Sequence, residues 1–295
     1  MTVLAAAGVA ILVLLTGNLP WAGFGPISGL GALNLRLGTT VPWAIVPMSL
    51  YLWAYWRFIG GKWGASTAAA TRQANLRANS LPARVWGAAL AAGVLGFGTL
   101  LALLTVVARL VNLPSSFPIV MPPEMPVVTS FLLLAMQSVV AGVSEESAFR
   151  GYMQSMIERE HGLALAILAN GTLFGLLHFG NHPGDVLLML PYYISVSAVY
   201  GGLTWAADSI LPALVLHSVA DIVVLTRWWI TGRPEWQVTQ TQSPLISQSG
   251  VDMSFIGAAI ASVALGLLTI WAYGAVRRLR MSTTASALPA TDGAR

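Results

Sequence analysis

Long apolar runs alternate with short polar or proline-rich segments along almost the whole chain. Each run approaches the roughly 20 apolar residues that a helix needs to cross a bilayer. Lipid cannot satisfy backbone amides and carbonyls, so such a run is predicted to be helical. The pattern predicts an all-α fold, a polytopic membrane bundle of about eight transmembrane helices. We expect these helices over residues 2–20, 41–59, 84–111, 127–157, 162–179, 185–206, 210–230 and 254–276.

Composition agrees with a membrane protein. Hydrophobic residues make up 56% of the chain and charged residues only 9%, whereas about a quarter of a soluble domain is charged. The chain has no cysteine, which excludes disulfides, thiol nucleophiles and cysteine metal sites. No long polar stretch could form a second domain. We therefore expect one membrane domain over residues 1–280 and a disordered cytoplasmic tail over residues 281–295.

The positive charges cluster in two segments. One is the loop from Arg57 to Arg84, which carries no acidic residue, and the other is the tail from Arg277 to Arg280. With eight crossings both segments fall on one side, and basic loops face the cytoplasm. We expect an integral protein of a prokaryotic plasma membrane with both termini in the cytoplasm. The excess positive charge then reflects topology in the lipid bilayer, and no nucleic-acid partner is expected.

A few ionisable residues lie inside the apolar runs, where a central charge costs about 2.5–3.5 kcal/mol. Any one of them could simply join helices, but six on three runs indicate a functional site. Glu146 and Arg150 are four residues apart and can pair on one helix face. Glu145 is rotated from Glu146 by about 100°, which leaves it free of that pair. The six are Glu145, Glu146, Arg150, His178, His217 and Asp221.

A free carboxylate, two histidines and an aspartate suit hydrolysis by an activated water. Glu145 would take the proton of the water, and His178 would hold or polarise that water. His217 would face the oxyanion of the tetrahedral intermediate.

Three motifs occur in order on separate apolar runs: "EESAFR" from Glu145 to Arg150, "FGLLH" from Phe174 to His178, and "HSVAD" from His217 to Asp221. Together they resemble the CPBP family, which comprises CAAX prenyl endopeptidases and bacteriocin-processing or self-immunity (Abi) proteins. The resemblance covers about residues 127–230 and implies an intramembrane endopeptidase.

The resemblance also implies a role for each motif position. Glu145 and His178 correspond to the water-activating pair, and His217 and Asp221 to the oxyanion side. Glu146 and Arg150 correspond to a structural salt bridge, with Phe174 supporting it. The family accepts asparagine or aspartate at position 221. We expect Asp221 either to be protonated or to orient and charge His217.

Cofactor and substrate stay open at this point. Glu145, His178 and His217 could form a three-ligand zinc site, but the resemblance favours catalysis without a metal or other cofactor. The expected substrate is a peptide or membrane-protein segment, lipidated or not. Two alternatives remain: a non-enzymatic immunity or scaffold protein, and a proton-coupled transporter that uses the ionisable residues as a relay.

Overall fold

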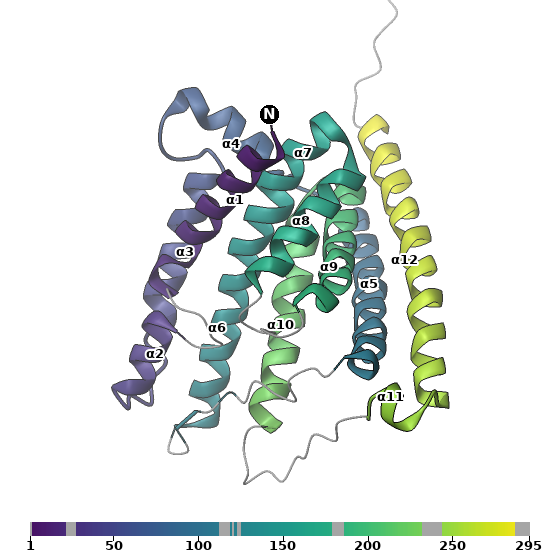
Figure 1. Cartoon of the computed structure of the whole chain (residues 1–295). Coiled ribbons are helices and arrows are strands. Elements are labelled where there is room, and N and C mark those ends of the chain that lie inside the picture. Colours follow the sequence, from purple (N-terminus) through teal and green to yellow (C-terminus); the bar gives the residue numbers. More distant parts are fainter. Residues whose placement is uncertain are drawn as a thin grey trace, which may run out of the picture.

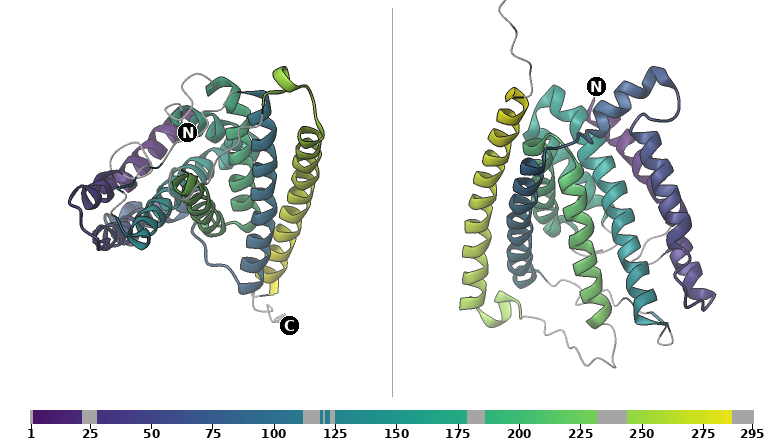
Figure 2. Two further views of the ribbon diagram at one scale, coloured as in Figure 1. Left: turned by 90° about the horizontal axis from the view of Figure 1, so that it is seen from below. Right: turned by 180° about the vertical axis from the view of Figure 1, so that it is seen from behind.

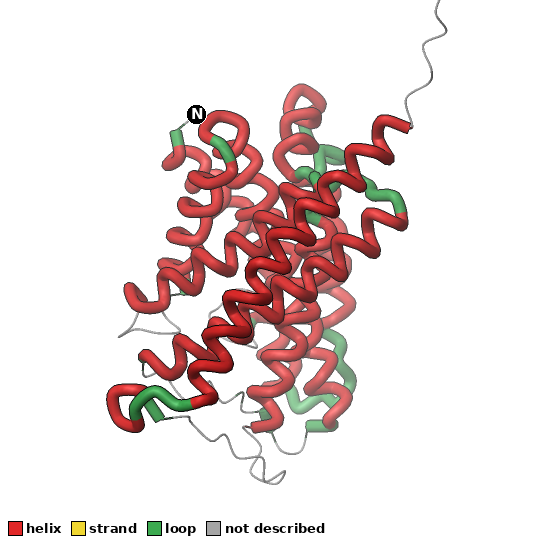
Figure 3. The backbone as a smooth tube through the Cα atoms, turned by 90° about the vertical axis from the view of Figure 1, so that its right-hand side faces the viewer, coloured by secondary structure: helices red, strands yellow, loops and turns green. Residues whose placement is uncertain are grey.

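The computed structural model describes residues 2–21, 28–111, 119, 121–122, 125–178, 186–231 and 244–286, and no strand occurs among them (Figures 1 and 3). Long helices run side by side as a bundle (Figure 2). The helices are α1 Val3–Asn18, α2 Gly29–Arg36, α3 Ile45–Ile59, α4 Ala69–Leu76, α5 Ala83–Leu110, α6 Val127–Glu145, α7 Gln154–His161, α8 Leu163–Leu177, α9 Val186–Ala207, α10 Leu211–Thr231, α11 Ile246–Ser249 and α12 Met253–Ser286. A π-helical segment, Glu146–Met153, joins α6 to α7, and short 3₁₀ turns occupy Leu19–Trp21 and Ser66–Ala68.

A helix lies at each of the eight predicted positions, so the polytopic helical bundle is confirmed. Within the described residues, six helical stretches are long and apolar enough to span a membrane, which makes this an integral membrane protein. The other two predicted spans are shorter: α3 and α8 have 15 residues each. At about 1.5 Å per residue they rise about 22 Å, less than the hydrocarbon thickness of about 30 Å.

Proline and glycine set several helix ends. Pro82 and Pro126 directly precede α5 and α6, where a missing backbone amide costs no helical hydrogen bond. Gly162 ends α7 and starts α8 with φ of 83°, a backbone conformation that glycine adopts without strain. At the other end of the chain, the tail expected from residue 281 was placed too early, because α12 continues to Ser286. Residues 287–295 lie outside the described residues.

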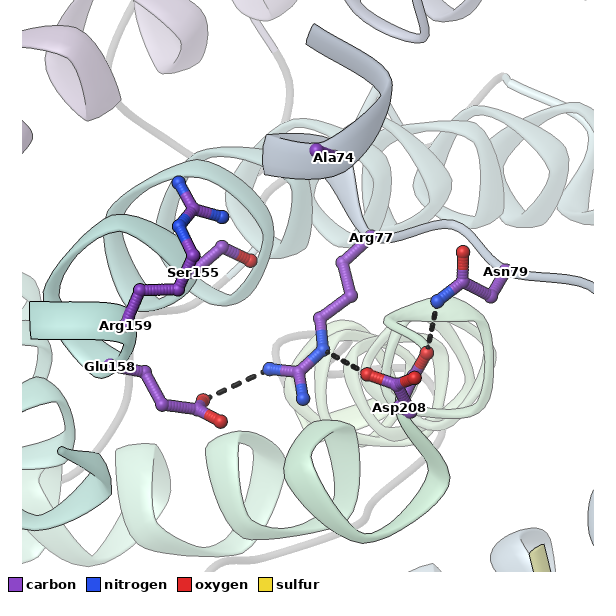
Figure 4. A pocket seen from close by; sticks show the side chains of 7 residues that line it. All are labelled: Ala74, Arg77, Asn79, Ser155, Glu158, Arg159 and Asp208. Atoms are coloured by element: carbon purple, nitrogen blue, oxygen red, sulfur yellow. Dashed lines mark hydrogen bonds and ion pairs between the residues drawn. The ribbon is translucent and has the colours of Figure 1, made fainter. Parts of the chain in front are cut away.

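Both basic segments meet at one end of the bundle. The start of α1, α4, α7 and the end of α12 lie together at the top of Figure 1. Asp208, in the turn between α9 and α10, pairs with Arg77 at 2.8 Å and with Arg280 at 2.5 Å. Arg77 also pairs with Glu158 of α7 at 2.9 Å, beside a cavity of about 250 Å³ (Figure 4). This arrangement agrees with the predicted even number of crossings.

Small residues let the motif-bearing helices approach closely. A Cβ added to Gly142 of α6 would lie 2.1 Å from Ser218 Oγ and 3.1 Å from its backbone nitrogen on α10. A Cβ on Gly171 of α8 would lie 2.5 Å from the Cα of Ile194 on α9. Glycine at these positions brings α6 against α10 and α8 against α9. Glu145 lies one helical turn after Gly142 on α6, and His217 directly precedes Ser218 on α10. The close approach of α6 to α10 therefore positions Glu145 and His217 relative to each other.

Candidate active site

The first motif lies where α6 changes into the π-helical segment. Glu145 is the last residue of α6, and Glu146 is the first of the segment, all eight residues of which are buried. Such π-helical turns are frequent at functional sites. Arg150 Nη1 lies 3.1 Å from Glu146 Oε1, and neither side chain has any exposed surface. The pair expected from the spacing is therefore present.

His217 of α10 connects the third motif to the first. Its Nδ1 lies 2.7 Å from Glu146 Oε1 in a buried hydrogen bond. A carboxylate only accepts, so Nδ1 carries the proton and donates. On the other side of the ring, Nε2 lies 3.7 Å from Glu145 Oε2 and 3.6 Å from Asp221 Oδ2. Glu146 thus has a second partner besides Arg150, which the sequence did not reveal.

The three carboxylate side chains differ in how much of their surface is exposed. Glu146 is fully enclosed, whereas the side chains of Glu145 and Asp221 are 20% and 33% exposed. Glu145 and Asp221 both face His217 Nε2, so a reacting group could approach between them. The sequence suggested that Asp221 is either protonated or orients and charges His217. The structure adds a hydrogen bond that His217 donates from its opposite nitrogen, Nδ1, to Glu146.

His178 is the first residue after α8. Its Nδ1 lies 2.7 Å from the carbonyl oxygen of Phe174, and the two rings are 4.3 Å apart. The carbonyl accepts, so Nδ1 donates and Nε2 stays available. Phe174 also lies 5.0 Å from the Arg150 guanidinium, which links the second motif to the first.

His178 is close enough to His217 and Asp221 for their charges to interact. The motifs relate Glu145 to His178, and the structure adds a contact of the Glu145 carboxylate with His217. In the described part of the chain, no three or more histidine, aspartate or glutamate side chains form a group able to hold a metal ion. Glu145, His178 and His217 are thus not gathered as a ligand set.

A helix without a motif completes the site. Tyr200 of α9 stacks on His217 with ring centroids 5.1 Å apart, and Tyr193 lies 5.1 Å from His178. Neither tyrosine belongs to one of the three motifs, so the motifs do not reveal these contacts. Spacings of four and seven residues from Tyr193 to Ser197 and Tyr200 were the only available signal.

The segment that carries these contacts is similar to a known family. Residues 127–223 match the Rce1-like family of type II CAAX prenyl endopeptidases. The matched segment runs from the first residue of α6 into α10 and includes all three motifs, so the resemblance drawn from them is confirmed there. No curated protein and no solved structure matches the chain. The Rce1-like segment supports a membrane-embedded protease that acts on a peptide or protein.

Proposed function

We propose that this protein is an intramembrane endopeptidase in which Glu145 activates the attacking water. The observation that carries the proposal is that Glu145 and Asp221 both lie within 4 Å of His217 Nε2, inside the segment that matches the Rce1-like family. Glu145 and Asp221 are partly exposed and lie beside His217, whose other nitrogen is held by Glu146. The site thus offers a carboxylate base and a hydrogen-bond donor at one point.

The reaction follows from these positions. Glu145 accepts a proton from a water molecule as the water oxygen bonds to the scissile carbonyl carbon. His217 Nε2, when protonated, donates to the oxyanion that forms. When the intermediate collapses, the carbon–nitrogen bond breaks, and the proton on Glu145 passes to the leaving amine. The water oxygen ends in the new carboxyl group.

The remaining motif residues have supporting roles in this scheme. Glu146 accepts from Nδ1 and thereby directs Nε2 of His217 toward the substrate. Arg150 balances the charge of Glu146 at a point without solvent. His178, with Nδ1 committed to Phe174, presents Nε2 to the water. Asp221 either donates to the oxyanion in its protonated form or stabilises a charged His217.

The substrate class follows from the family and the setting. The substrate is a peptide or a membrane-protein segment, with or without a lipid, that reaches the bundle from the bilayer. The basic end of the bundle faces the cytoplasm, with both termini there. The membrane is the plasma membrane of a prokaryote.

The proposal is tested with purified protein in detergent and a panel of quenched-fluorescence peptides, prenylated and unmodified. Cleavage by wild type is compared with that by Glu145→Gln, with and without a strong chelator, and bound metal is counted by elemental analysis. Glu160→Gln is the matched control, because Glu160 lies at the exposed end of α7.

Loss of cleavage in Glu145→Gln but not in Glu160→Gln, with no effect of chelator and no bound metal, supports the glutamate mechanism. Cleavage lost on chelation and restored by zinc overturns the metal-free form of the proposal. Cleavage by Glu145→Gln at the wild-type rate removes Glu145 from the chemistry.

A further inference from the structure

Helix α9 carries none of the three motifs, yet it faces all of them. Tyr193, Ser197 and Tyr200 are spaced by four and three residues, so they lie along one helix face. All three are buried, with 7%, 1% and 4% of their surface exposed. Each contacts a different motif side chain: His178, Arg150 and His217 respectively.

Tyr200 restrains a rotation of the His217 ring that the hydrogen bond to Glu146 leaves free. The hydrogen bond to Glu146 fixes where Nδ1 points but permits the ring to rotate about that bond. The Tyr200 ring lies nearly parallel to the imidazole, at an interplanar angle of 17°, which fixes the plane of the ring. Tyr200 also contacts Arg150, whose guanidinium carbon lies 5.3 Å from the centroid of the Tyr200 ring.

Tyr193 stands in the same relation to His178. Nδ1 of His178 is held by the Phe174 carbonyl at 2.7 Å, and the ring is tilted by 33° against Tyr193. Tyr193 is in turn packed edge-on against Phe174, with centroids 5.9 Å apart. In each case one oxygen fixes Nδ1, one α9 tyrosine covers the ring, and Nε2 is left for chemistry.

We infer that Tyr193 and Tyr200 are positioning residues, which hold the rings of His178 and His217 so that both Nε2 atoms keep a fixed direction. The inference rests on the proposed function for its effect on turnover, but the placement of the rings can be tested without any substrate. The aromatic ring is the part required, and the hydroxyl is dispensable for this role.

The first test is spectroscopic and uses the full chain in detergent. The chain has four histidines, so imidazole signals from selectively labelled protein can be assigned by replacing each in turn. A stacked ring shifts the signals of its neighbour, so Tyr200→Leu should move the His217 signals and leave those of His178 in place. Tyr193→Leu should do the reverse, and each phenylalanine variant should restore the wild-type shifts.

The control is Tyr273→Leu. Tyr273 is a buried tyrosine of α12 whose hydroxyl donates to the Val199 carbonyl at 2.9 Å, so its loss disturbs packing against α9 without touching either histidine. If Tyr200→Leu and Tyr193→Leu shift the histidine signals no more than Tyr273→Leu does, the inference is overturned, whatever the protein cleaves.

The second test uses the best-cleaved peptide of the panel. Misplacing a catalytic group by about 1 Å can cost about a hundredfold in rate, so we expect Tyr200→Leu to lose between about tenfold and a hundredfold in kcat. KM should change by less than about twofold, since the loss lies in the transition state. Tyr200→Phe should recover most of that kcat. A loss in Tyr200→Leu that matches only the fraction of unfolded protein, or no recovery in Tyr200→Phe, contradicts the inference.

Discussion

Glu146 and His217, 71 residues apart in sequence, share a buried hydrogen bond of 2.7 Å. The same carboxylate oxygen lies 3.1 Å from Arg150, so Glu146 sits between a permanent cation and the histidine that faces the site. Its two contacts have different consequences. The contact with Arg150 balances charge inside the bundle, and the contact with His217 sets which nitrogen is presented to the substrate.

These two roles can be separated by mutation. Glu146→Gln should destabilise the protein by about 3–5 kcal/mol, because it leaves the fully buried Arg150 without its counter-ion. The double variant Glu146→Gln/Arg150→Met removes both charges and should regain most of that stability. It should still cleave poorly, since a neutral amide no longer supports a charged His217. Thermal unfolding and peptide cleavage of the three proteins measure the two effects, and a double variant that cleaves like wild type would contradict this role of Glu146.

Asp221 offers a choice between two chemical roles. Its Oδ2 lies 3.6 Å from the same His217 nitrogen that faces Glu145, on the substrate side of the ring. Asp221→Asn keeps the size and supplies an amide donor, so full activity of this variant supports a neutral donor to the oxyanion. A loss of roughly a hundredfold supports a charged role toward His217. We expect Asp221→Asn to retain activity, because an ionised carboxylate at this position would repel the oxyanion. Measuring kcat of this variant on the best-cleaved peptide distinguishes the two roles.

The approach of α6 to α10 should tolerate no side chain at Gly142. In Gly142→Ala the new Cβ would lie 2.1 Å from Ser218 Oγ and 3.1 Å from the Ser218 backbone nitrogen. The Ser218 hydroxyl must therefore turn away and α10 must shift slightly from α6, which draws Glu146 away from His217. We expect a lower melting temperature and at least a tenfold loss of kcat, roughly the cost of displacing a catalytic contact. Gly87→Ala in α5 is the matched control. Nothing lies within 4 Å of its new Cβ, so it should be neutral or slightly stabilising.

A second substitution, at Ser218, tests whether contact with α10 causes the loss of activity in Gly142→Ala. Gly142→Ala/Ser218→Ala removes the hydroxyl oxygen that would be closest, although the backbone nitrogen of residue 218 would still lie 3.1 Å away. Partial recovery of both melting temperature and kcat is therefore expected. Equal effects of Gly142→Ala and Gly87→Ala would show that helix propensity, and not the interhelical distance, governs this position.

Some features of the site follow from sequence because they are local. Run length and hydropathy predicted the helices, and the four-residue spacing predicted the contact of Glu146 with Arg150. Spacing rules do not relate residues on different helices, however. The bond from His217 to Glu146 depends on how closely α6 approaches α10 and on the π-helical segment that begins at Glu146. For the same reason the sequence did not reveal that the Glu145 carboxylate lies beside His217.

Tyr200 shows a second limit of the sequence. An aromatic residue in an apolar helix has no property that separates a packing role from a site role, so the contact of Tyr200 with His217 becomes visible only in three dimensions. The predicted start of the disordered tail at residue 281 differs from the end of α12 for another reason. Residues 281–286 are mostly serine and threonine, but they continue α12 beyond its apolar stretch. The helix propensity of these residues is only a few tenths of a kcal/mol below that of leucine, so a helix that has already formed can extend through them.

A stability prediction concerns the end of the bundle opposite the basic segments. Arg109 of α5 is buried and contacts Asp252, which precedes α12, at 2.9 Å. The hydrogen bond from Arg109 is the main reason that the pKa of Asp252 lies well below its usual value, with the amide of Phe255 and the hydroxyl of Ser254 adding to the effect. A lowered pKa means that this stabilisation is complete above the unfolded pKa of about 3.9 and is lost as the pH falls toward the folded value.

Asp252→Asn should therefore lower the melting temperature at pH 7, and the difference from wild type should shrink as the pH is lowered from about 4 toward 3. Because Arg109 is the largest single cause of the shift, the same substitution in an Arg109→Met background should have a smaller effect at pH 7. Thermal unfolding in detergent of wild type, the two single variants and the double variant at pH 7 and pH 3 measures this. A difference between wild type and Asp252→Asn that stays constant, or grows, toward pH 3 would show that the Asp252 carboxylate does not stabilise this end of the bundle through its charge.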